Sequence, residues 1–144
     1  MTDSYRPRFH FAFNVTDLEL ARHFYVQALG CHEGRSTASW VDFDFYGHQL
    51  SLHLGEPMKT ALTGWVDGVQ VPMPHFGLCM NMADWQQAAM RLHAAQVPFV
   101  LPPQTRYAGQ AGEQGTLFVC DPFGNPIELK GFKDFAAVFA LQSK

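Results

Sequence analysis

The same order of elements occurs twice along the chain, and this internal repeat constrains the fold more than any other feature. In each copy, residue patterns of period 2 and then of period 3.6 predict a strand, a helix and three further strands. The two βαβββ units are expected at residues 8–54 and 75–131, joined by a linker or lid at 55–74 and followed by a C-terminal helix at 132–144. We therefore predict a single α+β domain, residues 1–144, in which the two repeats form a curled mixed sheet around a cavity.

Local signals set the bounds of these elements. Thr16 and Asp17 suit a helix N-cap region and Gly30 a C-cap, so the first helix is expected over 18–29. The first unit's strands are expected at 8–15, 31–35, 39–45 and 48–54, and the second unit's at 75–80, 99–107 (interrupted at Pro102 and Pro103), 116–120 and 126–131, with its helix at about 83–95. The terminal helix is expected to turn four apolar side chains inward, namely Phe132, Phe135, Val138 and Phe139.

Composition narrows the class of protein. With 47% hydrophobic and 16% charged residues, the 144-residue chain can bury a core. A net charge of −3 without a basic patch argues against nucleic-acid binding, and no apolar run reaches the roughly 18–20 residues that span a bilayer. The polar segment 1–8 does not resemble a secretory signal, so a cytoplasmic location is expected. Three cysteines without a CxxC pair disfavour disulfides and a zinc ribbon, and buried free thiols are expected.

The repeat places candidate metal ligands at equivalent positions. His10 and His75 each lie near the start of the first strand of their unit. Glu128 follows the turn glycine of the second unit by four residues, and the equivalent residue of the first unit is Ser51. Two imidazoles and one carboxylate leave coordination positions open for water and substrate, as in catalytic sites. We predict one divalent metal ion bound by His10, His75 and Glu128, with Fe(II) preferred and Zn(II), Mn(II) or Ni(II) as alternatives.

Two segments carry a resemblance to a known family. They are HFAFNVTDLELARHFYVQALG near the start and LFVCDPFGNPIELKGF near the end, and the second contains the pattern D-P-x-G-N-x-x-E. The chain resembles the vicinal oxygen chelate superfamily over about residues 8–132, most of all its small predicted extradiol-dioxygenase-like proteins. The resemblance implies the same three ligands, and a metal that binds two neighbouring oxygens of a substrate and stabilises an oxyanion or enolate.

Departures from the family pattern keep several functions open. Ring-cleaving relatives usually carry a tyrosine at the position of Phe118 and a histidine several residues upstream, but this chain has no histidine near Gln110. Glyoxalase I relatives place a fourth metal ligand at the position of Ser51. We expect a dioxygenase-like metal enzyme acting on a small molecule. The alternatives are a glyoxalase- or isomerase-type lyase, and a binding or resistance protein of the same fold without catalysis. A homodimer is expected, with the cavity built within one chain or across two.

Further polar residues are candidates for acid–base chemistry and substrate binding. His53 shares strand parity with Ser51, whereas His48 has the opposite parity, so His53 is the preferred acid–base group. For either histidine, a structural role bonded to backbone or solvent is a comparable alternative. Ser51, Arg106 and Tyr107 are candidate substrate-binding residues, although a solvent-exposed arginine at a strand end is the simpler interpretation of Arg106.

Overall fold

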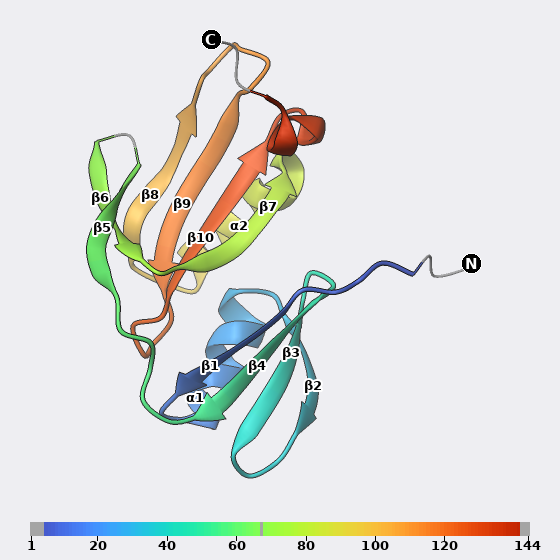
Figure 1. The fold of residues 1–144 in the computed structure, drawn as a ribbon, viewed down its shortest axis with the longest axis vertical. Helices are drawn as coiled ribbons and strands as arrows, with labels where there is room; N and C mark the ends of the chain where they lie inside the picture. The colour runs from blue at the N-terminus through green and yellow to red at the C-terminus, as the bar shows by residue number, and fades with distance from the viewer. Residues whose placement is uncertain (1–4, 67, 142–144) are drawn as a thin grey trace. The chain divides into compact units, whose positions relative to one another are not determined.

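Both copies of the predicted repeat are present in the structure, each as a four-stranded sheet with a helix (Figure 1). The structure is a computed structural model, and it describes residues 5–66 and 68–141. The chain divides into two compact units, Met1–Met58 and Lys59–Lys144, and the division falls within the predicted linker. The α+β class and the duplication predicted from the sequence are confirmed.

The first unit places its helix on one face of the sheet (Figure 1). The other face is polar. Its elements are β1 (His10–Val15), α1 (Leu18–Arg22), the π-helical segment η1 (His23–Ala28), β2 (His32–Ser36), β3 (Trp40–Phe45) and β4 (His48–Leu54). The sheet order is β1-β4-β3-β2, with β1 parallel to β4. Tyr25 stacks on Phe43 and packs against Phe13, and all three rings are buried. The side chains of alternate strand residues point to the opposite, polar face.

The second unit repeats this topology and adds a hairpin. Its elements are β5 (Ala61–Val66), β6 (Val69–Met73), β7 (Phe76–Asn81), α2 (Met82–Ala94), β8 (Phe99–Arg106), β9 (Gln114–Cys120), β10 (Pro126–Phe132) and the 3₁₀ turn η2 (Phe135–Phe139). The sheet order is β7-β10-β9-β8, with β7 parallel to β10. Trp85 of α2 packs directly on Gly115 and Gly131, and its Nε1–H donates to the carbonyl of Leu129 at 2.9 Å. The two glycines therefore make room for the indole.

Three local expectations need correction. The segment expected as a linker or lid contains the β5–β6 hairpin. The C-terminal helix is only the five-residue turn η2, because Phe132 belongs to β10, and a turn this short leaves Phe135 and Phe139 54% and 93% exposed. The cysteines are all free, but only Cys31 is buried. No helix in the described part of the chain has the length and apolarity needed to span a membrane.

Candidate metal centre and the polar sheet face

Strand register aligns the two units residue by residue. In the first unit, Ala12 of β1 is paired with Ser51 of β4. In the second unit, Gly77 of β7 is paired with Glu128 of β10. A histidine precedes the paired first-strand residue by two positions in both units, at His10 and His75. The register thus reproduces the repeat alignment that the turn glycines suggested, with Ser51 as the counterpart of Glu128.

His75 and Glu128 face each other across β7 and β10. Nε2 of His75 lies 3.2 Å from Oε1 of Glu128, and the two side chains are 20% and 9% exposed. Nδ1 of His75 lies 2.7 Å from the carbonyl oxygen of Pro72, which only accepts hydrogen bonds, so Nδ1 carries a proton. In the neutral imidazole, Nε2 then presents a lone pair to the carboxylate. Two acceptors this close repel unless a proton or a metal ion lies between them.

The surroundings hold this pair in place. The hydroxyl of Thr116 donates to Oε2 of Glu128 at 2.7 Å, so Oε1 remains directed at the imidazole. Phe118 packs edge-on against the His75 ring, with centroids 4.8 Å apart. A Cβ at Gly77 would lie 1.5 Å from the backbone carbonyl oxygen of Glu128, so only glycine fits at this position beside β10. The donor set, the fixed tautomer and the oriented carboxylate fit a divalent metal ion.

His10 is held in the same tautomer by a different device. Its Nδ1 lies 2.7 Å from Oε1 of Gln49, and the Gln49 amide nitrogen donates to Oδ2 of Asp42 at 3.4 Å. The carboxylate accepts only, so it fixes the amide orientation and makes His10 Nδ1 the donor. The hydroxyl of Ser51 donates to Oδ1 of Asp42 at 2.6 Å, and Asp42 is 7% exposed. Nε2 is therefore the nitrogen of His10 that carries a lone pair, as in His75.

Two of the three predicted ligands thus lie together, in the second unit. His10 belongs to the first unit. Across residues 5–66 and 68–141, no three His, Cys, Asp or Glu side chains form a group that could hold a metal ion. The His75–Glu128 pair supplies two ligands, and the three-ligand set remains a prediction.

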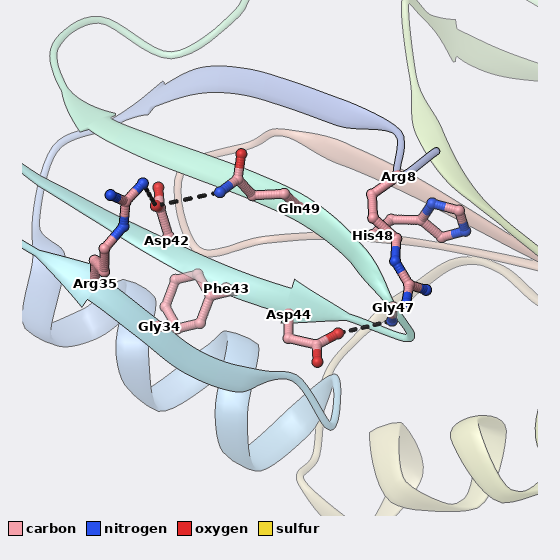
Figure 2. A pocket seen from close by; sticks show the side chains of 9 residues that line it. All are labelled: Arg8, Gly34, Arg35, Asp42, Phe43, Asp44, Gly47, His48 and Gln49. Carbon is pink, nitrogen blue, oxygen red and sulfur yellow. Dashed lines mark hydrogen bonds and ion pairs between the residues drawn. The ribbon is translucent and has the colours of Figure 1, made fainter. Parts of the chain in front are cut away.

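His48, rather than His53, lines a pocket of the first unit. The pocket has a volume of about 280 Å³ and lies on the polar sheet face (Figure 2). Nδ1 of His48 accepts a hydrogen bond from the backbone N–H of Phe9 at 3.1 Å. His53 is exposed and lies beside Trp40, with ring centroids 6.3 Å apart. The acid–base role stays a prediction for both histidines.

The predicted substrate-binding residues Arg106 and Tyr107 lie away from the pair. Arg106 is paired with Gln114, four residues along β9 from Phe118, which is about 13 Å at the usual strand rise. Its guanidinium lies 5.2 Å from the Tyr107 ring centroid, and one of its nitrogens donates to the tyrosine hydroxyl at 3.3 Å. Tyr107 lines a separate hollow beside η2. Ser51, by contrast, is part of the polar network next to His10.

Four residues around these sites were missed by sequence reasoning. They are Asp42, Gln49 and Thr116, which bond candidate ligands or their partners, and Arg8 in the pocket. Asp42 is paired with Ser51 on the neighbouring strand, and Thr116 lies diagonally opposite Glu128. Strand parity alone would have placed these side chains on the polar face. Their contacts depend on the register between strands, which the sequence pattern did not supply.

Solved structures with the same fold cover nearly the whole chain. A glyoxalase/bleomycin resistance protein/dioxygenase from Alicyclobacillus acidocaldarius matches 93% of this chain and 97% of its own, with 28% identity and a TM-score of 0.74. The fosfomycin resistance protein FosX of Listeria monocytogenes matches 88% and 93%, with 17% identity and a TM-score of 0.63. TioX from Micromonospora sp. ML1 matches 88% and 99%, with 20% identity and a TM-score of 0.64. At these identities, the last two likenesses concern the fold alone.

Family membership comes from the sequence itself. Comparison with the curated proteins gave no match. The model of the glyoxalase/bleomycin resistance protein/dioxygenase superfamily matches residues 9–129, which include all three candidate ligands and both βαβββ repeats except the end of β10. The chain therefore belongs to the glyoxalase/bleomycin resistance protein/dioxygenase superfamily.

Proposed function

We propose that this protein is a divalent-metal-dependent enzyme of the vicinal oxygen chelate type, with His10, His75 and Glu128 as metal ligands. The observation that supports the proposal is the contact of His75 Nε2 with Glu128 Oε1 at 3.2 Å, a separation at which two acceptors repel unless they share a proton or a metal ion. When bound, the metal supplies Lewis-acid polarisation to two neighbouring oxygens of a small substrate. Fe(II) is the preferred ion, and Zn(II), Mn(II) and Ni(II) also suit this donor set.

The chain's own residues prepare this site in three ways. Hydrogen bonds from Nδ1 to Pro72 and to Gln49 leave Nε2 of each histidine as the nitrogen with the free lone pair. Thr116 holds one oxygen of Glu128 so that the other faces His75. Phe118 forms an apolar wall beside His75, which excludes water from one side of the imidazole.

The reaction class is proposed as dioxygenase-like, with an isomerase or lyase as the alternative. Phe118 lacks the hydroxyl of the tyrosine that ring-cleaving relatives carry at this position, so one hydrogen-bonding group is missing beside His75. The isomerase and lyase classes are therefore tested as well. Anaerobic Fe(II) loading followed by O₂ uptake with a panel of catechols, run beside isomerase and lyase assays, separates these classes. O₂ uptake that depends on both Fe(II) and a catechol supports the dioxygenase.

Metal binding tests the ligand set without reference to activity. Calorimetric titration with Mn(II), Ni(II) and Zn(II), together with the visible absorption of bound Co(II), measures affinity and coordination. We expect His10→Ala, His75→Ala and Glu128→Gln each to weaken binding by more than the roughly 10–100-fold typical of second-shell changes. His93→Ala, at an exposed position of α2, is the matched control. Less than about a tenth of an equivalent of metal after reconstitution would instead indicate a binding protein without metal chemistry.

The proposal also includes a homodimer that acts on a small-molecule substrate. Sedimentation velocity of the apo and metal-loaded protein measures the mass directly. A monomer at micromolar concentration in both states would refute the dimer while leaving the ligand set to the metal titration.

A further inference from the structure

The polar pocket of the first unit is lined in part by Gln49 (Figure 2), the residue whose side chain bonds His10. Its volume of about 280 Å³ is slightly below the roughly 300–1,000 Å³ of sites that enclose a whole small ligand. We propose that it binds one oxyanion group, such as a carboxylate, of a small-molecule ligand. The assignment of that ligand as the enzyme's substrate rests on the proposed function, whereas the binding of the oxyanion itself does not.

Arg8 supplies the main reason for expecting an anion. Its guanidinium lies over the turn glycine Gly47, where a Cβ would be 3.0 Å from the arginine nitrogen. Gly47 also has a φ of +89°, so glycine suits both the turn and the space. Within described residues 5–58, no carboxylate lies within ion-pair distance of Arg8. A guanidinium offers five N–H donors and no acceptor, and because Arg8 is exposed to solvent these donors are accessible to an anionic ligand.

The two acidic residues of the pocket, Asp42 and Asp44, accept hydrogen bonds from neighbouring residues of the sheet. Asp42 accepts hydrogen bonds from the Ser51 hydroxyl and the Gln49 amide. Oδ1 of Asp44 accepts from the backbone N–H of Gly47 at 2.7 Å, which closes the β3–β4 turn (Figure 2). Both carboxylates therefore already accept hydrogen bonds from the sheet, whereas the Arg8 guanidinium remains open to a ligand.

Arg35 provides a second guanidinium at the opposite side of the pocket. It lies 3.7 Å from Oδ2 of Asp42, and its side chain is 83% exposed. So long and exposed an ion pair contributes little stability. Arg35 can consequently turn toward a ligand at small cost, and either guanidinium would offer a carboxylate forked hydrogen bonds.

The position of Arg8 ties this pocket to the candidate ligand His10. Strand pairing extends past the start of β1, because Gln49 N–H donates to the Phe9 carbonyl at 2.8 Å. Residues two apart on a strand share a face and lie about 7 Å apart, so Arg8 and His10 present their side chains on the same side. A small molecule held through its carboxylate at Arg8 would therefore extend along the face on which His10 lies.

The test uses the full-length apoprotein and small probes of defined charge. Amide chemical-shift titrations at low salt with benzoate, inorganic phosphate and benzylamine follow the signals of Gly47, His48 and Gln49. We expect saturable shifts with benzoate or phosphate at millimolar dissociation constants and none with benzylamine. Tighter benzoate binding would identify a carboxylate as the preferred group, and tighter phosphate binding a phosphate or phosphonate; either supports the oxyanion site.

Matched variants distinguish anion binding in this pocket from nonspecific attraction to the positive charge of the segment. Arg8→Gln is expected to weaken anion binding at least tenfold, and Arg8→Lys to restore part of it, because lysine keeps the charge and loses the fork. Arg6→Gln removes the same charge from an exposed residue outside the pocket and should change nothing. Equal losses from Arg6→Gln and Arg8→Gln, shifts with benzylamine alone, or no saturable shift would each overturn the proposal. Because no metal is present, failure here is distinct from failure of the metal-binding test.

Discussion

Replacing Thr116 by valine tests how the candidate carboxylate ligand is held. Valine has nearly the same shape as threonine, so the substitution removes a hydroxyl without opening a cavity. Thr116 is 1% exposed, and its Oγ1 lies 2.7 Å from Oε2 of Glu128. The substitution therefore leaves one oxygen of a buried carboxylate without the donor that holds it.

The expected magnitude follows from the chemistry of this bond. Hydrogen bonds to charged groups contribute about 1.5–3 kcal/mol, and no volume term adds to this. We expect Thr116→Val to lower the free energy of unfolding by about 2 kcal/mol, which at an m-value near 2 kcal/mol/M lowers the urea midpoint by about 1 M. The same loss of orientation at Glu128 should weaken metal binding by about 10–100-fold.

Urea denaturation followed by circular dichroism and calorimetric metal titration measure the two effects. Thr105→Val, at an exposed position of the neighbouring strand β8, is the control and should change stability by less than about 0.5 kcal/mol. In a Glu128→Gln background, Thr116→Val should cost only about 1 kcal/mol, because the bond to a neutral amide is weaker. Wild-type stability together with a metal affinity within twofold of wild type would refute the role assigned to this hydroxyl.

Three further predictions concern packing and pH. Gly77→Ala should abolish folded protein, as judged by circular dichroism, because its Cβ would lie 1.5 Å from the Glu128 carbonyl oxygen, whereas Gly112→Ala, with nothing within 4 Å, should fold normally. Trp85→Ala should lower the free energy of unfolding by about 3–5 kcal/mol in urea titrations, since the indole fills the space over two glycines and donates a buried hydrogen bond. Burial raises the pKa of the Cys120 thiol, with Asp121 adding to the shift, so the folded state keeps this proton where the unfolded chain loses it. Stability should therefore fall as pH rises above about 9, and fall less in Cys120→Ala.

The repeat and its equivalent positions were predictable because they depend on spacing. Alternation in 48–54 and the 3.6-residue period after Asp17 and in α2 are local signals, and the structure places elements where these signals lie. The turn glycines Gly47 and Gly124, both at positive φ, gave the alignment that makes Ser51 the counterpart of Glu128. Facts of this kind need no knowledge of which strands pair.

The β5–β6 hairpin was missed for a physical reason. A register shift between Leu62 and Gly64 interrupts the alternation that marks a strand. Val71 is buried against Leu101 and Phe118, while Trp65 on the partner strand is 67% exposed. The sequence pattern reveals neither this register shift nor the residues, distant in sequence, against which Val71 packs. The hairpin nevertheless matters for the site, because its second strand, β6, contains Pro72, whose carbonyl oxygen bonds Nδ1 of His75.

The equivalent histidines of the two units, His10 and His75, have different neighbours. This difference explains why the duplicated chain has one histidine–carboxylate pair instead of two. In the second unit, the carboxylate stands on the last strand, where Glu128 faces the imidazole directly at 3.2 Å. In the first unit, that position is Ser51, and the carboxylate of Asp42 comes from the neighbouring strand, separated from His10 by the Gln49 amide. Asp42 therefore fixes the orientation of His10 without competing for its Nε2. On the polar face of the first unit, Asp42 is engaged by Ser51 and Gln49, so we expect Arg8 and Arg35 to bind the ligand there. The metal titration tests the second unit's pair, and the anion titration tests this pocket.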